Sequence, residues 1–234
     1  MKAIVLAAGL SRSLYPLTKN KHKGLLLING KPLISHTVEK IQKVPNIEKI
    51  YIHTNEKFYK DYLQWKEDSG FDVEIVSNGI EGRRGSINEL KFVVNKLGIK
   101  ENLMVLAGEH LYDFSLRNFR DFFKENGSSI VAVCDYEDKN LIACRVGCVV
   151  LNGDKVVEFD EKPEEPKSSL ASTACYILKK EDLALLDKFE KERLGDFVAF
   201  LVEHSNVRGY IIGKDKRWFP VSNVDQYNYL KNNY

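Results

Sequence analysis

Apolar, β-branched runs alternate with stretches of helical periodicity through the first 135 residues. Strands are predicted at 2 to 7, 47 to 54, 72 to 77, 102 to 107 and 129 to 135. Helices are predicted at 32 to 43, 56 to 68, 86 to 97 and 115 to 125, with N-caps at Ser86 and Ser115 and C-terminal stops at Gly70, Gly98 and Gly127. This alternation predicts a mostly parallel sheet that is covered by helices on both faces.

From residue 142 the pattern changes to strands joined by turns. Further strands are predicted at 142 to 151, 155 to 160, 172 to 178 and 207 to 212, and further helices at 180 to 190, at 195 to 204 and from 223. The turn Asn152-Gly153-Asp154 is a strong hairpin signal between two apolar runs. Because no repeat or linker interrupts the chain, residues 1–234 are expected to form one domain, with halves 1–135 and 136–234 on a shared sheet.

Composition narrows the range of partners. The 234 residues include 35 basic and 33 acidic side chains, a net charge of +2 that is too balanced for nonspecific nucleic-acid binding. No apolar run approaches a membrane span, and the N-terminus resembles a strand rather than a signal peptide, so a cytoplasmic protein is expected. The cysteines lie in apolar runs and are expected to be reduced core residues rather than metal ligands: Cys134, Cys144, Cys148 and Cys175.

The first strand ends in a glycine turn beside several cations. The apolar run Lys2–Ala7 breaks at Ala8-Gly9 into a polar loop that reaches Thr18. Basic side chains follow at Arg12, Lys19, Lys21 and Lys23. Backbone N–H groups and cations at the end of a buried strand suit an anion, so phosphate binding is the first hypothesis.

Four spaced elements carry a family resemblance: Ala7-Ala8-Gly9, Pro16-Leu17-Thr18, Lys23 with Leu25-Leu26, and Gly30-Lys31-Pro32-Leu33. In this order they resemble the N-terminal signature of the sugar-1-phosphate nucleotidylyltransferases, and most of all the glucose-1-phosphate thymidylyltransferase branch. The resemblance implies a three-layer α/β fold of the nucleotide-diphospho-sugar transferase type, with a mixed, mostly parallel central sheet. It also implies nucleotidyl transfer from a nucleoside triphosphate to a sugar 1-phosphate, with Mg²⁺ as cofactor.

On this resemblance, the first half binds the nucleotide, and Lys23 and Arg12 are catalytic cations on its phosphates. The implied nucleotide-binding residues are Leu6, Ala7, Ala8, Gly9, Leu10, Ser11, Gly82, Gly85 and Gly108. The segment Gly82-Arg83-Arg84-Gly85-Ser86 opens a helix as the family's segment near the base and ribose does. Two residues depart from the pattern: Ser13 stands in the place of the catalytic arginine, and His22, interpreted as a surface residue, replaces a proline.

The remaining implied residues bind the metal and the sugar phosphate. Glu109, after a predicted strand, resembles the family's metal-binding Asp. Glu161 and Lys162 match the family's Glu-Lys-Pro motif, in which the glutamate binds sugar hydroxyls and the lysine the sugar phosphate. The resemblance therefore makes Lys162 a third catalytic cation, beside Lys23 and Arg12. Gly147 and Thr173 are assigned to the same sugar-phosphate site. Pro220 falls on the position of a second metal-binding Asp, and Asp225 is not assigned as a ligand.

Three functions stay open at this point. The favoured one uses dTTP or UTP and a sugar 1-phosphate. The second is a cytidylyltransferase that uses CTP and a non-sugar phosphate, and the third is a catalytically weak nucleotide-binding or regulatory homologue, which Ser13 and Pro220 favour. The sequence leaves the oligomeric state open, a homo-oligomer included.

Overall fold

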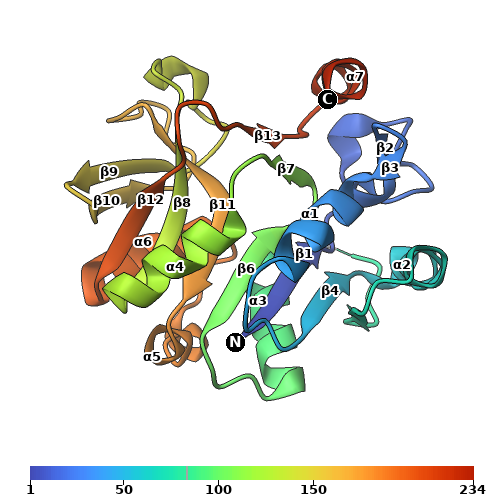
Figure 1. Cartoon of the computed structure of the whole chain (residues 1–234), viewed down its shortest axis with the longest axis horizontal. Coiled ribbons are helices and arrows are strands. Elements are labelled where there is room, and N and C mark those ends of the chain that lie inside the picture. Colours follow the sequence, from blue (N-terminus) through green and yellow to red (C-terminus); the bar gives the residue numbers. More distant parts are fainter. Residues whose placement is uncertain (83) are drawn as a thin grey trace.

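The protein is described here from a computed structural model that covers residues 1–82 and 84–234. A nine-stranded sheet runs through both halves of the chain (Figure 1). Its strands lie in the order β5 (Glu74–Ser77), β4 (Ile50–Thr54), β1 (Lys2–Ala7), β6 (Leu103–Ala107), β11 (Leu170–Leu178), β8 (Ser129–Asp135), β12 (Val207–Ile211), β10 (Lys155–Asp160) and β9 (Cys148–Asn152).

The sheet is mixed, as the sequence predicts. β5, β4, β1 and β6 are joined by parallel pairings, and so are β8 and β12. β11 is antiparallel to both of its neighbours, β6 and β8, and so connects the two parallel blocks. Only β11 and β10 run against the direction of the other strands.

Helices cover the two faces of the sheet (Figure 1). One apolar core joins a face to α1 (Leu33–Gln42), α2 (Glu56–Ser69) and α4 (Leu116–Asn126). A second core joins the other face to α3 (Ser86–Leu97), α5 (Lys180–Leu183) and α6 (Leu194–His204). A smaller cluster holds α7 (Val224–Asn233) against the loops after β1 and the hairpin of β2 (Leu27–Ile28) and β3 (Lys31–Pro32). The result is three layers, helix–sheet–helix.

Several element boundaries follow local sequence signals. Ser115 caps α4 by accepting a hydrogen bond from the N–H of Asn118. Gly70, Gly98 and Gly127 end α2, α3 and α4 in the left-handed region, as predicted. The predicted cap at Ser86 is wrong: Gly85 precedes α3, and the Ser86 hydroxyl instead accepts a hydrogen bond from the N–H of Leu194.

Other predicted boundaries differ from the structure. The strand expected at 142 to 151 is formed only over Cys148–Asn152, because residues 142–147 fold into turns with Cys144 at φ 56°. Cys144 is therefore exposed rather than a core residue, and all four cysteines are free thiols. The helix expected at 180 to 190 divides into α5 and a 3-10 turn at Leu186–Lys188. Four short strands are additional: β2 and β3, which pair with each other, and β7 (His110–Tyr112) and β13 (Trp218–Pro220), which also pair with each other.

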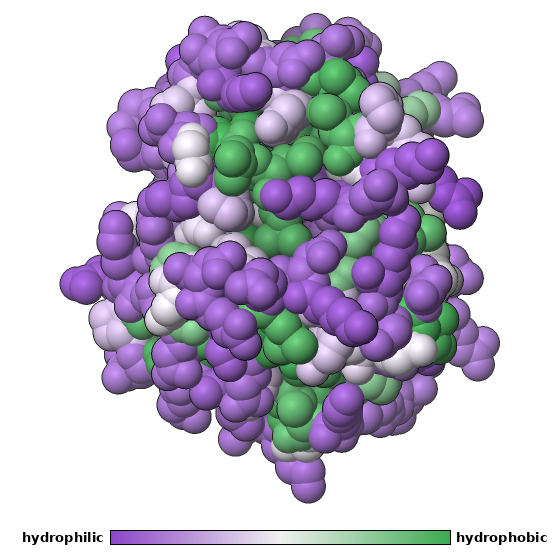
Figure 2. All heavy atoms as spheres, turned by 90° about the vertical axis from the view of Figure 1, so that its right-hand side faces the viewer, coloured by the Kyte–Doolittle hydropathy of each residue, from purple (hydrophilic) through white to green (hydrophobic). Residues whose placement is uncertain are grey.

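Hydrophilic side chains cover most of the molecular edge that carries α2 and the β2–β3 hairpin, with apolar side chains between them (Figure 2). The described part of the chain contains no helix that is long and apolar enough to span a membrane.

Candidate active site

A cleft of about 440 Å³ opens at the carboxyl ends of β1 and β6, between the two halves of the chain. Ligands of open α/β sheets collect at this edge. Most of the site residues predicted from the sequence line the cleft: Leu6, Ala8, Gly9, Leu10, Ser11, Lys23, Gly85, Glu109, Gly147, Glu161 and Lys162. Residues separated by more than a hundred positions therefore form one continuous wall.

The loop after β1 is held from both sides. The amide of Asn55 donates a hydrogen bond of 2.9 Å to the carbonyl of Ala8, and the hydroxyl of Thr18 donates one of 2.7 Å to the carbonyl of Ser11. Asn55 and Thr18 are both fully buried. These bonds fix the backbone around Gly9 at the cleft, where its N–H groups can meet an anion.

Lys23 and Glu109 form an ion pair on the wall of the cleft contributed by the first half of the chain. Lys23 Nζ lies 3.0 Å from Glu109 Oε2 and donates a hydrogen bond of 2.6 Å to the carbonyl of Val221. Ser11 Oγ donates to the same carboxylate oxygen at 3.2 Å. Burial favours the neutral acid, but the positive charge of Lys23 and its hydrogen bond to the carboxylate outweigh burial, and the pKa of Glu109 is lowered to about 2. Glu109 is thus an anion at neutral pH.

His22 is completely buried, so its interpretation as a surface residue is wrong. Its Nδ1 accepts hydrogen bonds from the hydroxyl of Tyr62 at 2.7 Å and from the N–H of Gly24 at 3.0 Å. A Cβ at Gly24 would lie 2.6 Å from the Tyr62 hydroxyl, so only glycine allows this approach. Burial lowers the pKa of His22 to about 4, so the ring is neutral at neutral pH. Its hydrogen bonds hold the backbone in place immediately before Lys23.

His110 follows Glu109 and also lines the cleft. The indole N–H of Trp218 donates to His110 Nδ1 at 3.2 Å, and burial lowers the pKa of His110 to about 4. In the β13–β7 pairing Pro220 lies opposite His110, so the proline stands beside the position of Glu109. Asp225, in the first turn of α7, does not line this cleft.

The wall of the cleft contributed by the second half of the chain is built around Glu161. A Cβ at Gly147 would lie 3.3 Å from Glu161 Oε2, and one at Gly195 only 2.0 Å from it, so two glycines make room for the carboxylate. Burial raises the pKa of Glu161, with Lys162 and Arg193 acting in the opposite direction. Lys162, Arg145 and Arg193 line the same region as cations. Arg193 and Gly195 were not singled out from the sequence, because nothing in their local pattern points to a site.

Five predicted site residues do not line the cleft. Thr173 is fully buried, and its hydroxyl donates to the carbonyl of Ala132 at 2.9 Å, which directs the side chain away; Ser172 and Ala174 face the cleft instead. Ala7 and Gly108 pack behind the wall, where a Cβ at Gly108 would lie 3.0 Å from Ala7 Cβ. Arg12 is exposed on the loop surface.

Gly82 is also exposed, and the neighbouring Arg83 of the predicted basic turn lies outside the described residues. Arg84 and Gly85 of the same turn do line the cleft.

A backbone tie joins the two halves at one end of the cleft. The N–H of Ile87 donates to the carbonyl of Glu192 at 3.0 Å, and the N–H of Leu194 donates to Ser86 Oγ at 2.8 Å. Gly85, at φ +85°, lies so close that a Cβ would be 2.7 Å from the Glu192 carbonyl. The N-terminus of α3 is thereby fixed to the turn that carries Arg193.

The predicted Mg²⁺ has a limited set of protein donors. No cluster of three or more His, Cys, Asp or Glu side chains able to hold a metal occurs within residues 1–82 and 84–234. Glu109 Oε2 is shared by Lys23 and Ser11, while Pro220 offers no side-chain ligand. One carboxylate beside a cation-lined cleft is compatible with Mg²⁺, which is commonly held by one or two carboxylates together with substrate phosphates.

The layered sheet, with a cation-lined cleft at its strand ends, has the nucleotide-diphospho-sugar transferase fold. Residues 2–234 match the sequence model of the family described as Nucleotidyl transferase, and the chain belongs to this family. The predicted family resemblance and fold are thereby confirmed.

Similar proteins carry related names. A candidate mannose-1-phosphate guanyltransferase of Sulfolobus acidocaldarius is 28% identical over 203 residues, which cover 86% of this chain and 54% of that protein. A UTP–glucose-1-phosphate uridylyltransferase of Haloferax volcanii is 29% identical over 180 residues, covering 75% of this chain and 71% of the relative. The chain thus spans only about half the length of the first.

A solved structure shows the same fold. The crystal structure of a candidate glucose-1-phosphate thymidylyltransferase from Bacillus anthracis superposes with a TM-score of 0.86 at 21% identity, over 99% of this chain and 94% of the other.

Proposed function

We propose that the protein transfers a nucleotidyl group from a nucleoside triphosphate to a sugar 1-phosphate. An oxygen of the sugar phosphate attacks the α-phosphorus, the bond from the α-phosphorus to the oxygen that bridges to the β-phosphorus breaks, and pyrophosphate leaves with the electron pair. Because two anions must approach each other, the site has to supply positive charge to both.

The observation that carries this proposal is the placement of cations on both walls of one cleft. Lys23 and the backbone of the Gly9 loop face it from the first half, and Lys162, Arg145 and Arg193 face it from the second. Glu161 lines the same cleft as these cations, and its carboxylate can accept hydrogen bonds from hydroxyl groups. A phosphate with a polyhydroxylated body matches this combination of charges.

Mg²⁺ is part of the proposal, with Glu109 as its protein ligand. The ion would neutralise charge on the triphosphate. Lys23 holds the carboxylate in its anionic, ligand-competent state.

The donor is proposed to be dTTP or UTP and the acceptor glucose 1-phosphate or a related sugar 1-phosphate. The family resemblance favours these substrates, and the names of the Haloferax and Bacillus proteins agree with them. The test is pyrophosphate release with dTTP, UTP, GTP or CTP against glucose, mannose and N-acetylglucosamine 1-phosphates, with Mg²⁺. Turnover with at least one sugar 1-phosphate is expected; no turnover with any pair overturns the enzymatic proposal.

Two features favour a second candidate, a catalytically weak binding homologue. Arg12 is exposed on the loop, and Pro220 stands beside Glu109 where the family has a second acidic ligand. The double variant Ser13→Arg/Pro220→Asp separates the two candidates. A large gain in rate favours the weak homologue, whereas no gain in an already active protein favours a native site of altered design.

A further inference from the structure

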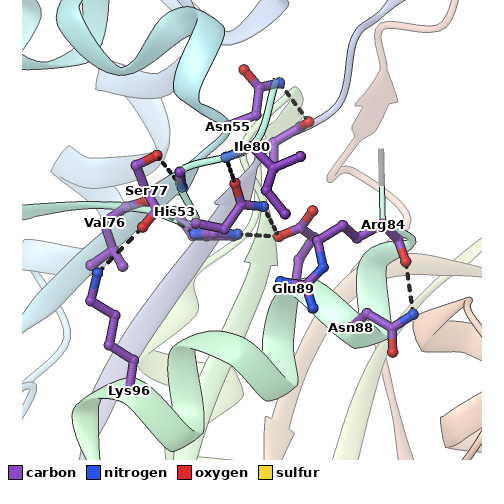
Figure 3. Close-up of polar contacts among 12 residues, drawn as sticks. His53, Asn55, Val76, Ser77, Ile80, Arg84, Asn88, Glu89 and Lys96 are labelled. Carbon is purple, nitrogen blue, oxygen red and sulfur yellow. Dashed lines mark hydrogen bonds and ion pairs between the residues drawn. The ribbon is translucent and has the colours of Figure 1, made fainter. Parts of the chain in front are cut away.

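A buried histidine–glutamate pair lies beneath the nucleotide-binding side of the cleft. His53, on β4, is completely buried, and the side chain of Glu89, in the first turn of α3, is 6% exposed. His53 Nε2 lies 2.6 Å from Glu89 Oε2. Figure 3 shows the side chains of His53 and Glu89 meeting end to end. The side-chain amide of Asn78 donates a hydrogen bond to the same carboxylate oxygen.

The hydrogen bonds around this pair determine which atoms carry protons. His53 Nδ1 lies 3.0 Å from the carbonyl of Val76, which can only accept, so Nδ1 carries a hydrogen. Asn78 Oδ1 accepts from the N–H of Ile80 at 2.8 Å, so its amide nitrogen donates to Glu89 Oε2 at 2.8 Å. One further proton is shared between His53 Nε2 and Glu89 Oε2. Wherever it rests, Glu89 Oε1 carries no hydrogen.

Glu89 Oε1 is the one polar atom of this network that is left over. It is buried and has no hydrogen-bond partner among the described residues, and Glu89 lines the cleft near Leu6 and Gly85. A buried acceptor without a donor is destabilising, because it has lost its hydrogen bonds to water without replacement. A donor from a bound ligand would remove that destabilisation.

We propose that Glu89 Oε1 accepts the ring N–H of the nucleotide base and so selects uracil, thymine or guanine over cytosine and adenine. This inference rests on the proposed function, because it assumes that the cleft binds a nucleoside triphosphate. Uracil and thymine present N3–H on their pairing edge, and guanine presents N1–H. Cytosine and adenine have a bare ring nitrogen at the equivalent position.

The discrimination follows from the fixed proton arrangement. A ring N–H meets a carboxylate oxygen that can only accept, which makes a charge-assisted hydrogen bond. A bare ring nitrogen would instead face that oxygen with its own lone pair. A site built to accept a hydrogen bond rejects the analogue that lacks the donor, because the buried partner is then unsatisfied. His53 and Asn78 prevent Glu89 from turning away, so they act as positioning residues.

The first experiment leaves the protein unchanged. Dissociation constants are measured by calorimetry with Mg²⁺ and without a sugar phosphate. One comparison is UTP against N3-methyl-UTP, and the other is UTP against dTTP, GTP, CTP and ATP. Loss of a hydrogen bond to a charged group raises a dissociation constant by about 10- to 100-fold. N3-methyl-UTP, CTP and ATP are therefore expected to bind more weakly than UTP by that factor.

The second experiment repeats the UTP and N3-methyl-UTP pair on Glu89→Gln, with Glu203→Gln, an exposed position of α6, as the matched control. The ratio of the two constants is expected to fall to about twofold or less in Glu89→Gln and to stay unchanged in Glu203→Gln. A ratio that persists in folded Glu89→Gln shows that the methyl group is excluded by shape alone and overturns the inference.

The outcomes separate the two proposals. If no nucleotide binds, the proposed function fails. If nucleotides bind but N3-methyl-UTP, CTP and UTP bind equally well, nucleotide binding stands and the role of Glu89 is wrong. The analogue comparison on the unmodified protein decides the matter even if Glu89→Gln does not fold.

Discussion

Gly195 lies directly against the carboxylate of Glu161, and a Cβ at this glycine would be 2.0 Å from Oε2 and 2.7 Å from Cδ. Gly195→Ala is therefore expected to displace Glu161. Since a shift of about 1 Å at a reacting site can cost about 100-fold, kcat/KM for the sugar phosphate should fall by about 10- to 100-fold. Steady-state kinetics with each substrate varied, and Glu203→Ala on the same helix as control, check this. An unchanged kcat/KM for the acceptor would contradict it.

Thr173 should matter for stability rather than for the acceptor. Its buried hydroxyl bonds to the carbonyl of Ala132 in the sheet, so Thr173→Val should lower the free energy of unfolding by about 1–2 kcal/mol. Denaturant unfolding measures the loss, and the KM for the sugar phosphate should stay constant. Ser172→Ala is the comparison, because Ser172 faces the cleft. A rise in KM specific to Thr173→Val would restore the role predicted from the sequence.

Lys23 and Lys21 form a matched pair of lysines in one loop. Lys23 is 7% exposed at its side chain and bonds to Glu109, whereas Lys21 is exposed and does not line the cleft. Lys23→Met should lower the rate of pyrophosphate release by about 100- to 1000-fold, the usual loss when one charge-stabilising donor is removed. Lys21→Met should lose less than about threefold. Equal losses would show that the loop charge acts only through long-range attraction.

The buried His22 and the half-buried His110 should make the fold sensitive to mild acid. The pKa values of His22 and His110 are lowered to about 4 by burial, whereas in the unfolded chain histidine titrates near about 6.5. Below that pH the unfolded state binds more protons, so the free energy of unfolding falls as the pH drops from about 6.5 to about 4. Each fully retained shift corresponds to about 3 kcal/mol.

Urea unfolding between pH 7 and 4 measures how the free energy of unfolding changes with pH. Proton NMR of the imidazole signals measures the pKa values of the two histidines directly. His22→Asn should reduce the slope. A midpoint near about 6.5 for the His22 ring in the folded protein would exclude the burial effect.

The sequence predicted those parts of the fold that depend on neighbours along the chain. β1 and β8 begin and end as predicted, and Gly70, Gly98 and Gly127 end their helices, because apolar periodicity and backbone conformation are local properties. The strand at 142 to 151 was overextended, since an apolar composition alone does not distinguish a strand from the turns around Cys144.

The candidate site residues divide in the same way, into those that a local sequence motif predicts and those that only the tertiary structure reveals. Motif matches placed Lys23, Glu109, Glu161 and Lys162 in one cleft. The buried position of His22 depends on a hydrogen bond to Tyr62, forty residues away. Glu89 can be recognised as a candidate ligand-binding residue only once the fold places His53 of β4 against it. No periodic pattern in the sequence predicts these contacts, because each of them forms only in the folded tertiary structure.

The start of α3 and the turn before α6 are hydrogen bonded to each other. The proposed site for the nucleotide base and the proposed site for the sugar phosphate therefore cannot move independently. The stretch that carries Glu89 is hydrogen bonded to Glu192 and Leu194, on either side of Arg193. On the proposed function, a substitution that shifts the start of α3 and so alters base binding is expected also to shift Arg193. Altering the choice of nucleotide in this protein is therefore expected to require compensating changes around residues 192 to 195, so the two specificities would diverge together rather than one at a time.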